Sequence, residues 1–198
     1  NGRVTFTTAD DELFNAVRCA LPAAKLHYRG RYDWGISKAP ALFATLRALH
    51  LMGCRSERKH VPPPYLTASS AERLELLRGL LDTDGSARSD GMVEFSSASP
   101  ALADAVEHLV RSLGGVTRRH LKKTTRLDAH RVYVKMPPGM NPFRLRRKAA
   151  AWVAPTKYPP SRIVVAVEPD GQEEARCIRV AATDQLYVTR SFVVTHNT

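Results

Sequence analysis

The stretch from Ser69 to Gly85 contains signals for both the start and the end of a helix, and it constrains the fold more than any other stretch. Ser69 is followed three residues later by Glu72, which is the spacing of a capping box. Gly85 can adopt the left-handed conformation that ends a helix. These signals predict a helix of about four turns, from Ala71 to Thr83.

The interior of this helix is apolar on more than one face, which predicts that other elements cover it on several sides. Gly79 lies among the leucines, where a glycine costs roughly 1 kcal/mol relative to alanine. We therefore expect another backbone to approach closely at Gly79. The leucines concerned are Leu74, Leu76, Leu77, Leu80 and Leu81.

Two acids, Asp82 and Asp84, stand at the negative end of the helix dipole, where a carboxylate is disfavoured by about 0.3–1 kcal/mol. One interpretation is that they bind a cation. The other is that they form a solvated turn with Gly85. The residues alone leave both interpretations open.

The stretch Leu77-Arg78-Gly79-Leu80-Leu81-Asp82-Thr83-Asp84-Gly85 resembles the signature helix of the LAGLIDADG homing endonucleases, and departs from it mainly at Arg78 and Thr83. In that family two such helices pack through their glycines, and the second aspartate of each holds a divalent metal over a DNA phosphate. The resemblance implies that Gly79 packs against a second helix, that Asp84 binds a metal, and that the cofactor is Mg²⁺.

The sequence also contains an internal duplication with an offset of 89 residues. Seven residues recur at that offset, which predicts two copies of one α+β unit. The identical pairs are Gly2 and Gly91, Val4 and Val93, Phe6 and Phe95, Ala9 and Ala98, Leu13 and Leu102, Ala16 and Ala105, and Val17 and Val106. The same offset places the counterpart of Asp84 just before residue 1, so we expect the partner of the signature helix to lie upstream.

Two lysines related by this offset, Lys59 and Lys148, are candidates for the cleavage chemistry. Phosphodiester hydrolysis needs basic groups beside the metal. In the resembling family a lysine before an Ile/Val-Pro step belongs to the active centre, and Lys59-His60-Val61-Pro62 matches that pattern. Lys148 would serve the other strand with Asp84, although Arg146 and Arg147 compete for its role. The alternative is that both lysines are surface residues of basic runs.

The formal net charge of +11 favours a polyanionic partner. Alternate side chains of the strands after the signature helix are candidates for contacts with double-stranded DNA, as a group rather than singly, since each alone can be a solvated residue. They are Arg118, His120, Lys122, Arg131, Tyr133 and Lys135. No apolar run is long enough for a membrane span, and no secretory signal opens the sequence.

From Ser161 the sequence turns to short β-type runs: Ile163 to Glu168, Cys177 to Val180, Leu186 to Val188 and Phe192 to Thr195. The ending His196-Asn197-Thr198 resembles the downstream splice junction of inteins. In that family Asn197 would cyclise and break its bond to Thr198, His196 would assist, and Thr198 would be an acyl acceptor.

Cys177 stands in a run that resembles the intein motif before the junction, which implies the class 3 type, in which an internal cysteine attacks the upstream splice bond. Its alternative is a small buried residue of a strand. Asp184-Gln185 departs from the family, where a histidine is frequent. The remaining cysteines, Cys19 and Cys54, show no metal-binding spacing, which fits a reducing compartment and a cytoplasmic location.

The predicted fold class is α+β, with a LAGLIDADG αββαββα-type repeat whose first copy is incomplete, followed by a β-rich, Hint-type C-terminal segment. The predicted domains are residues 1–60, 61–155 and 156–198. The predicted function is a site-specific DNA endonuclease nested in a self-splicing intein, with the upstream intein half and the host-protein exteins as further partners. The alternative is a decayed DNA-binding module or intein remnant.

Overall fold

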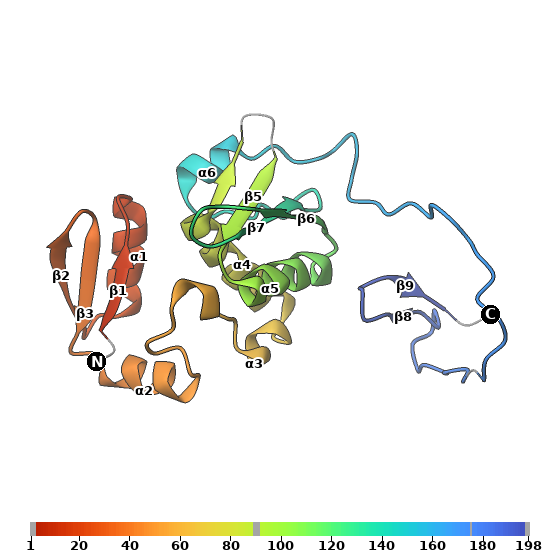
Figure 1. The fold of residues 1–198 in the computed structure, drawn as a ribbon, viewed down its shortest axis with the longest axis horizontal. Helices are drawn as coiled ribbons and strands as arrows, with labels where there is room; N and C mark the ends of the chain where they lie inside the picture. The colour runs from red at the N-terminus through yellow and green to blue at the C-terminus, as the bar shows by residue number, and fades with distance from the viewer. Residues whose placement is uncertain (1–2, 89–91, 175, 197–198) are drawn as a thin grey trace.

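The computed structural model describes residues 3–88, 92–174 and 176–196. Two small α/β units stand side by side, and a long C-terminal segment leaves the second of them (Figure 1). In the described residues no helix is long and apolar enough to cross a membrane.

The first unit is a three-stranded antiparallel sheet with the order β1-β3-β2, followed by short helices. Phe14 of its first helix packs on Trp34 of the sheet, with ring centroids 4.3 Å apart. The elements are β1 (Val4–Thr7), α1 (Asp11–Ala20), β2 (Lys25–Gly30), β3 (Asp33–Ser37), α2 (Pro40–Ala48), η1 (Ser56–Arg58) and α3 (Pro63–Leu66).

Helix α4 (Ser70–Asp84) opens the second unit and contains the predicted helix. The capping box is present, since the Ser69 hydroxyl accepts the Glu72 N–H and the Glu72 carboxylate accepts the Ser69 N–H. The predicted left-handed Gly85 is wrong, because Gly85 is extended, with φ −105°, and starts a strand directly. A Cβ there would lie 2.6 Å from the Leu81 carbonyl oxygen, so close packing explains this glycine.

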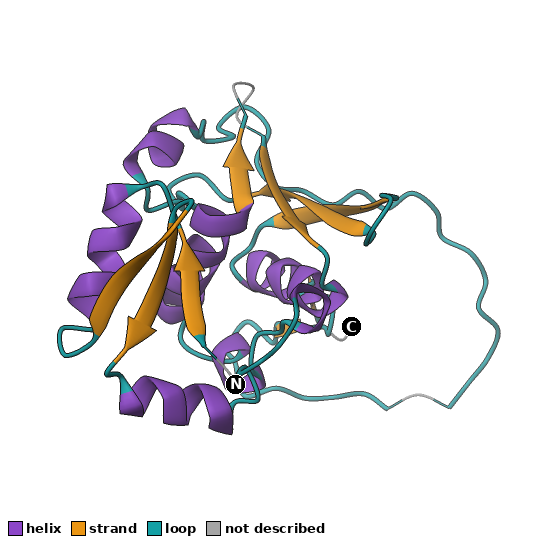
Figure 2. Cartoon of the chain, turned by 60° about the vertical axis from the view of Figure 1, so that its left-hand side comes forward, coloured by secondary structure: helices purple, strands orange, loops and turns teal. Residues whose placement is uncertain are grey.

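The sheet of the second unit has the order β4-β5-β7-β6 and is antiparallel throughout, so β5-β7-β6 repeats the order β1-β3-β2. Helices α4 and α5 pack against it and against each other, as the two views show (Figures 1 and 2). Its elements after α4 are β4 (Gly85–Ala87), β5 (Val93–Ser97), α5 (Pro100–Ser112), β6 (Val116–Lys122), β7 (Ala129–Lys135) and α6 (Arg146–Ala151).

The core of the protein lies in this second unit. Leu77 and Leu81 of α4 are fully buried against Phe95 of the sheet and against the apolar face of α5. Further fully buried residues of the described chain are Val93, Val106, Leu109, Val110, Val132, Met136 and Pro142.

The C-terminal segment forms a single described hairpin, β8 (Tyr187–Val188) with β9 (Val194–Thr195). Its Phe192 ring meets the His108 ring of α5 edge to face, with centroids 4.9 Å apart. The predicted strands over Ile163 to Glu168 and Cys177 to Val180 are not formed, and the Val165 side chain is 94% exposed.

Candidate functional site

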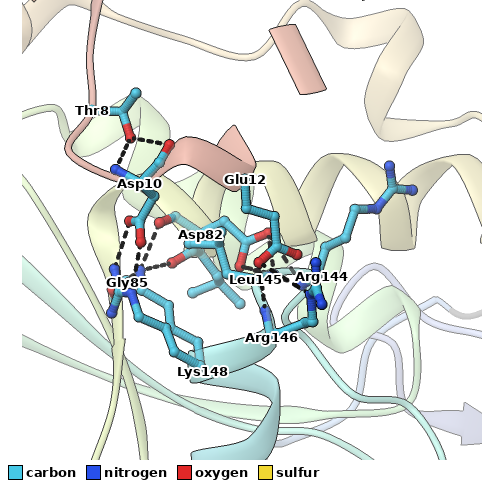
Figure 3. Close-up of polar contacts among 11 residues, drawn as sticks. Thr8, Asp10, Glu12, Asp82, Gly85, Arg144, Leu145, Arg146 and Lys148 are labelled. Carbon is cyan, nitrogen blue, oxygen red and sulfur yellow. Dashed lines mark hydrogen bonds and ion pairs between the residues drawn. The ribbon is translucent and has the colours of Figure 1, made fainter. Parts of the chain in front are cut away.

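The end of α4 separates its two aspartates. The Asp82 side chain is buried and accepts the backbone N–H groups of Arg144 and Leu145, at 3.1–3.3 Å, at the start of α6 (Figure 3). Burial raises the pKa of Asp82, while the N–H groups of Leu145 and Arg144 oppose that rise. Asp82 therefore joins two helices.

Asp84 is exposed and makes no hydrogen bond or ion pair with the described residues. Mg²⁺ takes oxygen ligands and is commonly held by one or two carboxylates together with the phosphates of the substrate. An exposed carboxylate without protein partners suits that coordination. The described residues contain no group of three or more His, Cys, Asp or Glu that could hold a metal by itself.

Lys148 lies beneath the turn that carries Asp84. Its ammonium donates to the carbonyl oxygens of Leu81 at 2.9 Å, Asp82 at 2.6 Å and Gly85 at 2.6 Å. A positive charge here stabilises the negative end of the α4 dipole and the open carbonyls of its last turn. Burial lowers the pKa of Lys148, and neighbouring Arg147 acts in the same direction.

The two arginines that compete with Lys148 contact the first unit instead. The Arg147 guanidinium donates two hydrogen bonds to Asp10, at 3.0 and 2.8 Å, and the Arg146 backbone N–H donates to Glu12 at 3.2 Å (Figure 3). The hydrogen bond from Arg147 holds the pKa of Asp10 below its usual value. These contacts tie the start of α1 to the start of α6.

Lys59 occupies the equivalent place in the first unit, with an exposed side chain. Its backbone carbonyl accepts the hydroxyl of Ser99, the N-cap of α5, at 2.5 Å. The offset of 89 residues relates Asp10 to Ser99 and Lys59 to Lys148. The end of each unit thus contacts the N-cap of the corresponding helix of the other unit, α1 or α5, which is the arrangement of a pseudo-twofold pair.

A basic face covers the side of the second sheet opposite its core. Arg118 pairs with Tyr133 and His120 pairs with Arg131 in the register of β6 and β7, so these side chains share one face. Lys122 and Lys135 lie two residues further along the same strands, whereas Val132 and Val134 are buried on the other face. The six predicted DNA contacts therefore belong to one surface.

The other predicted residues are the helix glycine Gly79, the cysteine Cys177 and the three C-terminal residues. Within the described residues no atom lies within 4 Å of a Cβ placed on Gly79, so the expected close approach has no partner there. Cys177 is an exposed free thiol outside any strand. His196 ends the described chain, and Asn197 and Thr198 lie outside the described residues.

The sequence predicts no functional role for Asp10, Ser99 or Glu94, although Asp10 and Asp11 are both candidate caps of a helix. Ser99 precedes Pro100, a common helix start that could have indicated the cap. Glu94 alternates with Val93 and Phe95, so the pattern places it on the exposed face of β5. No local signal indicates the contact between Asp10 and Arg147, because it joins residues far apart in the chain.

Residues 71–147 match the family model of the LAGLIDADG-like domain. The chain is also 33% identical, over 169 residues, to the replicative DNA helicase DnaB of Mycobacterium intracellulare. That match covers 81% of this chain but 29% of the length of the helicase.

Among solved structures, the chain is similar to I-DmoI in complex with DNA and Mn, with 14% identity, a TM-score of 0.48, and coverage of 67% of this chain and 73% of the other. It is also similar to mesophilic variants of the homing endonuclease I-DmoI, with 12% identity, a TM-score of 0.47 and 75% coverage of both chains. Residues 71–147 are thus a LAGLIDADG-like domain within a mixed α/β chain.

Proposed function

We propose that this chain is part of a homing endonuclease that cuts double-stranded DNA at a specific site with Mg²⁺, and that the endonuclease is nested in an intein. The observation that carries the proposal is the end of α4, where the LAGLIDADG-like domain leaves Asp84 exposed while Asp82 and Lys148 secure the turn around it. The basic sheet face of the same unit supports DNA as the substrate.

In this proposal Asp84 holds the metal, which supplies charge neutralisation at the scissile phosphate and lowers the pKa of a water molecule. Lys148 acts through the turn: its three hydrogen bonds fix the backbone on both sides of Asp84. In this arrangement the Lys148 ammonium contacts the backbone of the turn and does not contact the DNA phosphate directly. The exposed Lys59 is available for the second strand, together with an aspartate contributed by a second signature helix.

Gly79 of α4 indicates where that second helix would pack. Gly79 presents open space among the described residues, and a mid-helix glycine costs roughly 1 kcal/mol relative to alanine, which close packing of another helix can offset. A helix from the upstream part of the precursor, packed through its own glycine, would use this space and supply the second aspartate.

The proposed host is a replicative DNA helicase of the DnaB kind, because the similarity to that protein extends over most of this chain and only part of the helicase. The helicase activity itself is not assigned to this chain. In the splicing reaction the Asn197 side-chain amide nitrogen attacks its own carbonyl carbon, forming a succinimide and releasing the amino group of Thr198, with His196 moving the proton. The Cys177 thiol would attack the carbonyl carbon of the upstream splice bond, forming a thioester and releasing the amino group of the residue after that bond, which takes up the thiol proton.

The endonuclease is tested with the full-length precursor and a plasmid that carries a DnaB coding sequence joined without the insertion. We expect Mg²⁺ to support linearisation of this plasmid and a chelator to abolish it, while a plasmid that retains the insertion stays intact. Binding of the plasmid without cleavage in any divalent metal would contradict the proposal and favour a decayed DNA-binding module.

Splicing is tested by Asn197→Ala in the same precursor. We expect the variant to accumulate protein in which the C-terminal bond is intact, because cyclisation needs the side-chain amide. Mass spectrometry of the products measures it. Continued release of the downstream product at the wild-type rate would contradict the splicing assignment.

A further inference from the structure

The basic face of the second sheet contains an acid at its centre. Glu94 of β5 stands opposite Tyr133 of β7 and Ser86 of β4, and so shares the face of the basic residues. Among the described residues of that face it is the one carboxylate. Its basic neighbours there are Arg88, Arg118, His120, Lys122, Arg131 and Lys135.

Glu94 forms an ion pair with Arg131, whose Nε lies 3.2 Å from Glu94 Oε1. The Glu94 side chain is 15% exposed and that of Arg131 is 34% exposed. Arg131 Nε is buried and has no hydrogen-bond partner in the part of the chain that the structure describes, so the contact is an attraction of charges without hydrogen-bond alignment. The terminal nitrogens of Arg131 make no hydrogen bond to the described residues.

A carboxylate on a surface that meets phosphates lowers the affinity for any duplex, because it repels the backbone and offsets one basic charge. Such a group needs a compensating benefit. An arginine reads guanine with its planar, two-pronged edge, and this discrimination depends on a fixed guanidinium orientation. The partly buried Glu94 carboxylate attracts the Nε side of Arg131, and this attraction of charges restricts where the guanidinium can lie.

We propose that Glu94 is a positioning residue for sequence recognition: it holds Arg131 so that the terminal nitrogens of Arg131 meet a guanine in the major groove. This inference rests on the proposed function, since it assumes that the basic face binds duplex DNA. It makes Glu94 a residue that weakens binding to all DNA and increases the preference for one base pair.

The test is selection from a library of randomised duplex DNA by the full-length precursor at one fixed salt concentration, followed by affinity measurements on the selected and on unrelated duplexes. Arg131→Ala identifies the base pair that Arg131 reads. Glu94→Gln keeps the shape and removes the charge, Glu94→Ala removes the side chain, and Asp104→Asn removes a charge from α5 as the matched control.

We expect both Glu94 variants to bind unrelated duplex more tightly and to lose the preference for guanine about tenfold, at the position that Arg131→Ala also affects. The Asp104 control should change both quantities by less than twofold. Retention of the preference in Glu94→Ala, or selection without any base preference by the wild-type chain, would overturn the inference. Failure of the wild-type chain to bind any duplex would instead count against the proposed function itself.

Discussion

The two α/β units share a strand order but differ in their interiors. In the second unit Phe95, Leu77 and Leu81 are fully buried, whereas among the described residues 3–60 the buried residues are Gly35 and Ala39. Phe6, which the offset relates to Phe95, is partly exposed. A sheet and its first helix therefore do not make a core in this protein, and the difference between the units is the presence of α4.

The proposed endonuclease function would depend on α4 as well. The same helix that closes the core ends in Asp84 and receives Lys148. A unit without such a helix has the corresponding strands but lacks the carboxylate and the packed interior that would hold it. In the second unit, the packed core and the proposed metal-binding carboxylate thus both depend on α4.

The largest expected effect comes from the pair Phe95→Ala and Phe6→Ala. Removing a fully buried phenylalanine costs about 3–5 kcal/mol, and we expect that loss at Phe95. At the partly exposed Phe6 we expect about 1 kcal/mol. Urea unfolding of both variants measures the difference, and equal losses would show that the first unit has a core of its own.

Lys148→Met, with Lys59→Met as its matched control, should have the next largest effect. Lys148→Met removes three hydrogen bonds at the end of α4 and should cost about 2 kcal/mol, partly offset by removal of a buried charge. The exposed Lys59 should cost less than about 0.5 kcal/mol. A loss at Lys59 as large as that at Lys148 would contradict the distinction between them.

The pH dependence of the Lys148 effect provides a second test. Because the pKa of Lys148 is lowered in the folded state, the unfolded state binds more protons between that lowered value and 10.5. The stability contributed at this site therefore rises with pH through that window, and Lys148→Met should remove the rise. Thermal unfolding at a series of alkaline pH values measures it, and identical pH profiles would contradict it.

Asp82→Asn should destabilise the fold by about 1–3 kcal/mol, because the carboxylate accepts two backbone N–H groups in a buried position. Asp84→Asn should change the free energy of unfolding by less than about 0.5 kcal/mol, since Asp84 is exposed. Urea unfolding distinguishes them. Similar losses from both would mean that Asp84 also has a structural role.

The smallest effect is expected from Asp10→Asn, which removes the ion pair that joins the two units. Both partners are partly exposed, so we expect less than about 1 kcal/mol, and less still at high salt. The folded-state pKa of Asp10 is lowered, so its stabilisation is present above pH 3.8 and is lost as the pH falls through the lowered value. A difference between wild type and variant that persists at pH 2 would contradict this origin.

The sequence predicts those features that depend on neighbouring residues. The capping box at Ser69, the helix over α4 and the alternating strand residues of β6 and β7 all rest on local spacing, and all are present. The resemblance carried by Leu77 to Gly85 falls entirely inside the matched domain. The boundaries at residues 60/61 and 155/156 stay predictions.

The features that could not be predicted depend on distant partners. Ile163 to Glu168 has the composition of a strand, but a strand forms only where another edge is offered. In the sequence Lys148 is one member of a basic run, and only the tertiary fold places the carbonyls of Leu81, Asp82 and Gly85 around it. The difference in burial between Asp82 and Asp84 has the same cause, because Asp82 is covered by the residues at the start of α6, which lie far away in the sequence.

The measurement that tests the central claim most directly is plasmid cleavage by the full-length precursor carrying Asp84→Asn, with Mg²⁺ present and with folding and DNA binding checked in parallel. We expect a folded protein that binds the target duplex as tightly as wild type and produces no linear plasmid. Linearisation at the wild-type rate by the Asp84→Asn precursor would contradict the assignment of Asp84 as the metal-binding carboxylate.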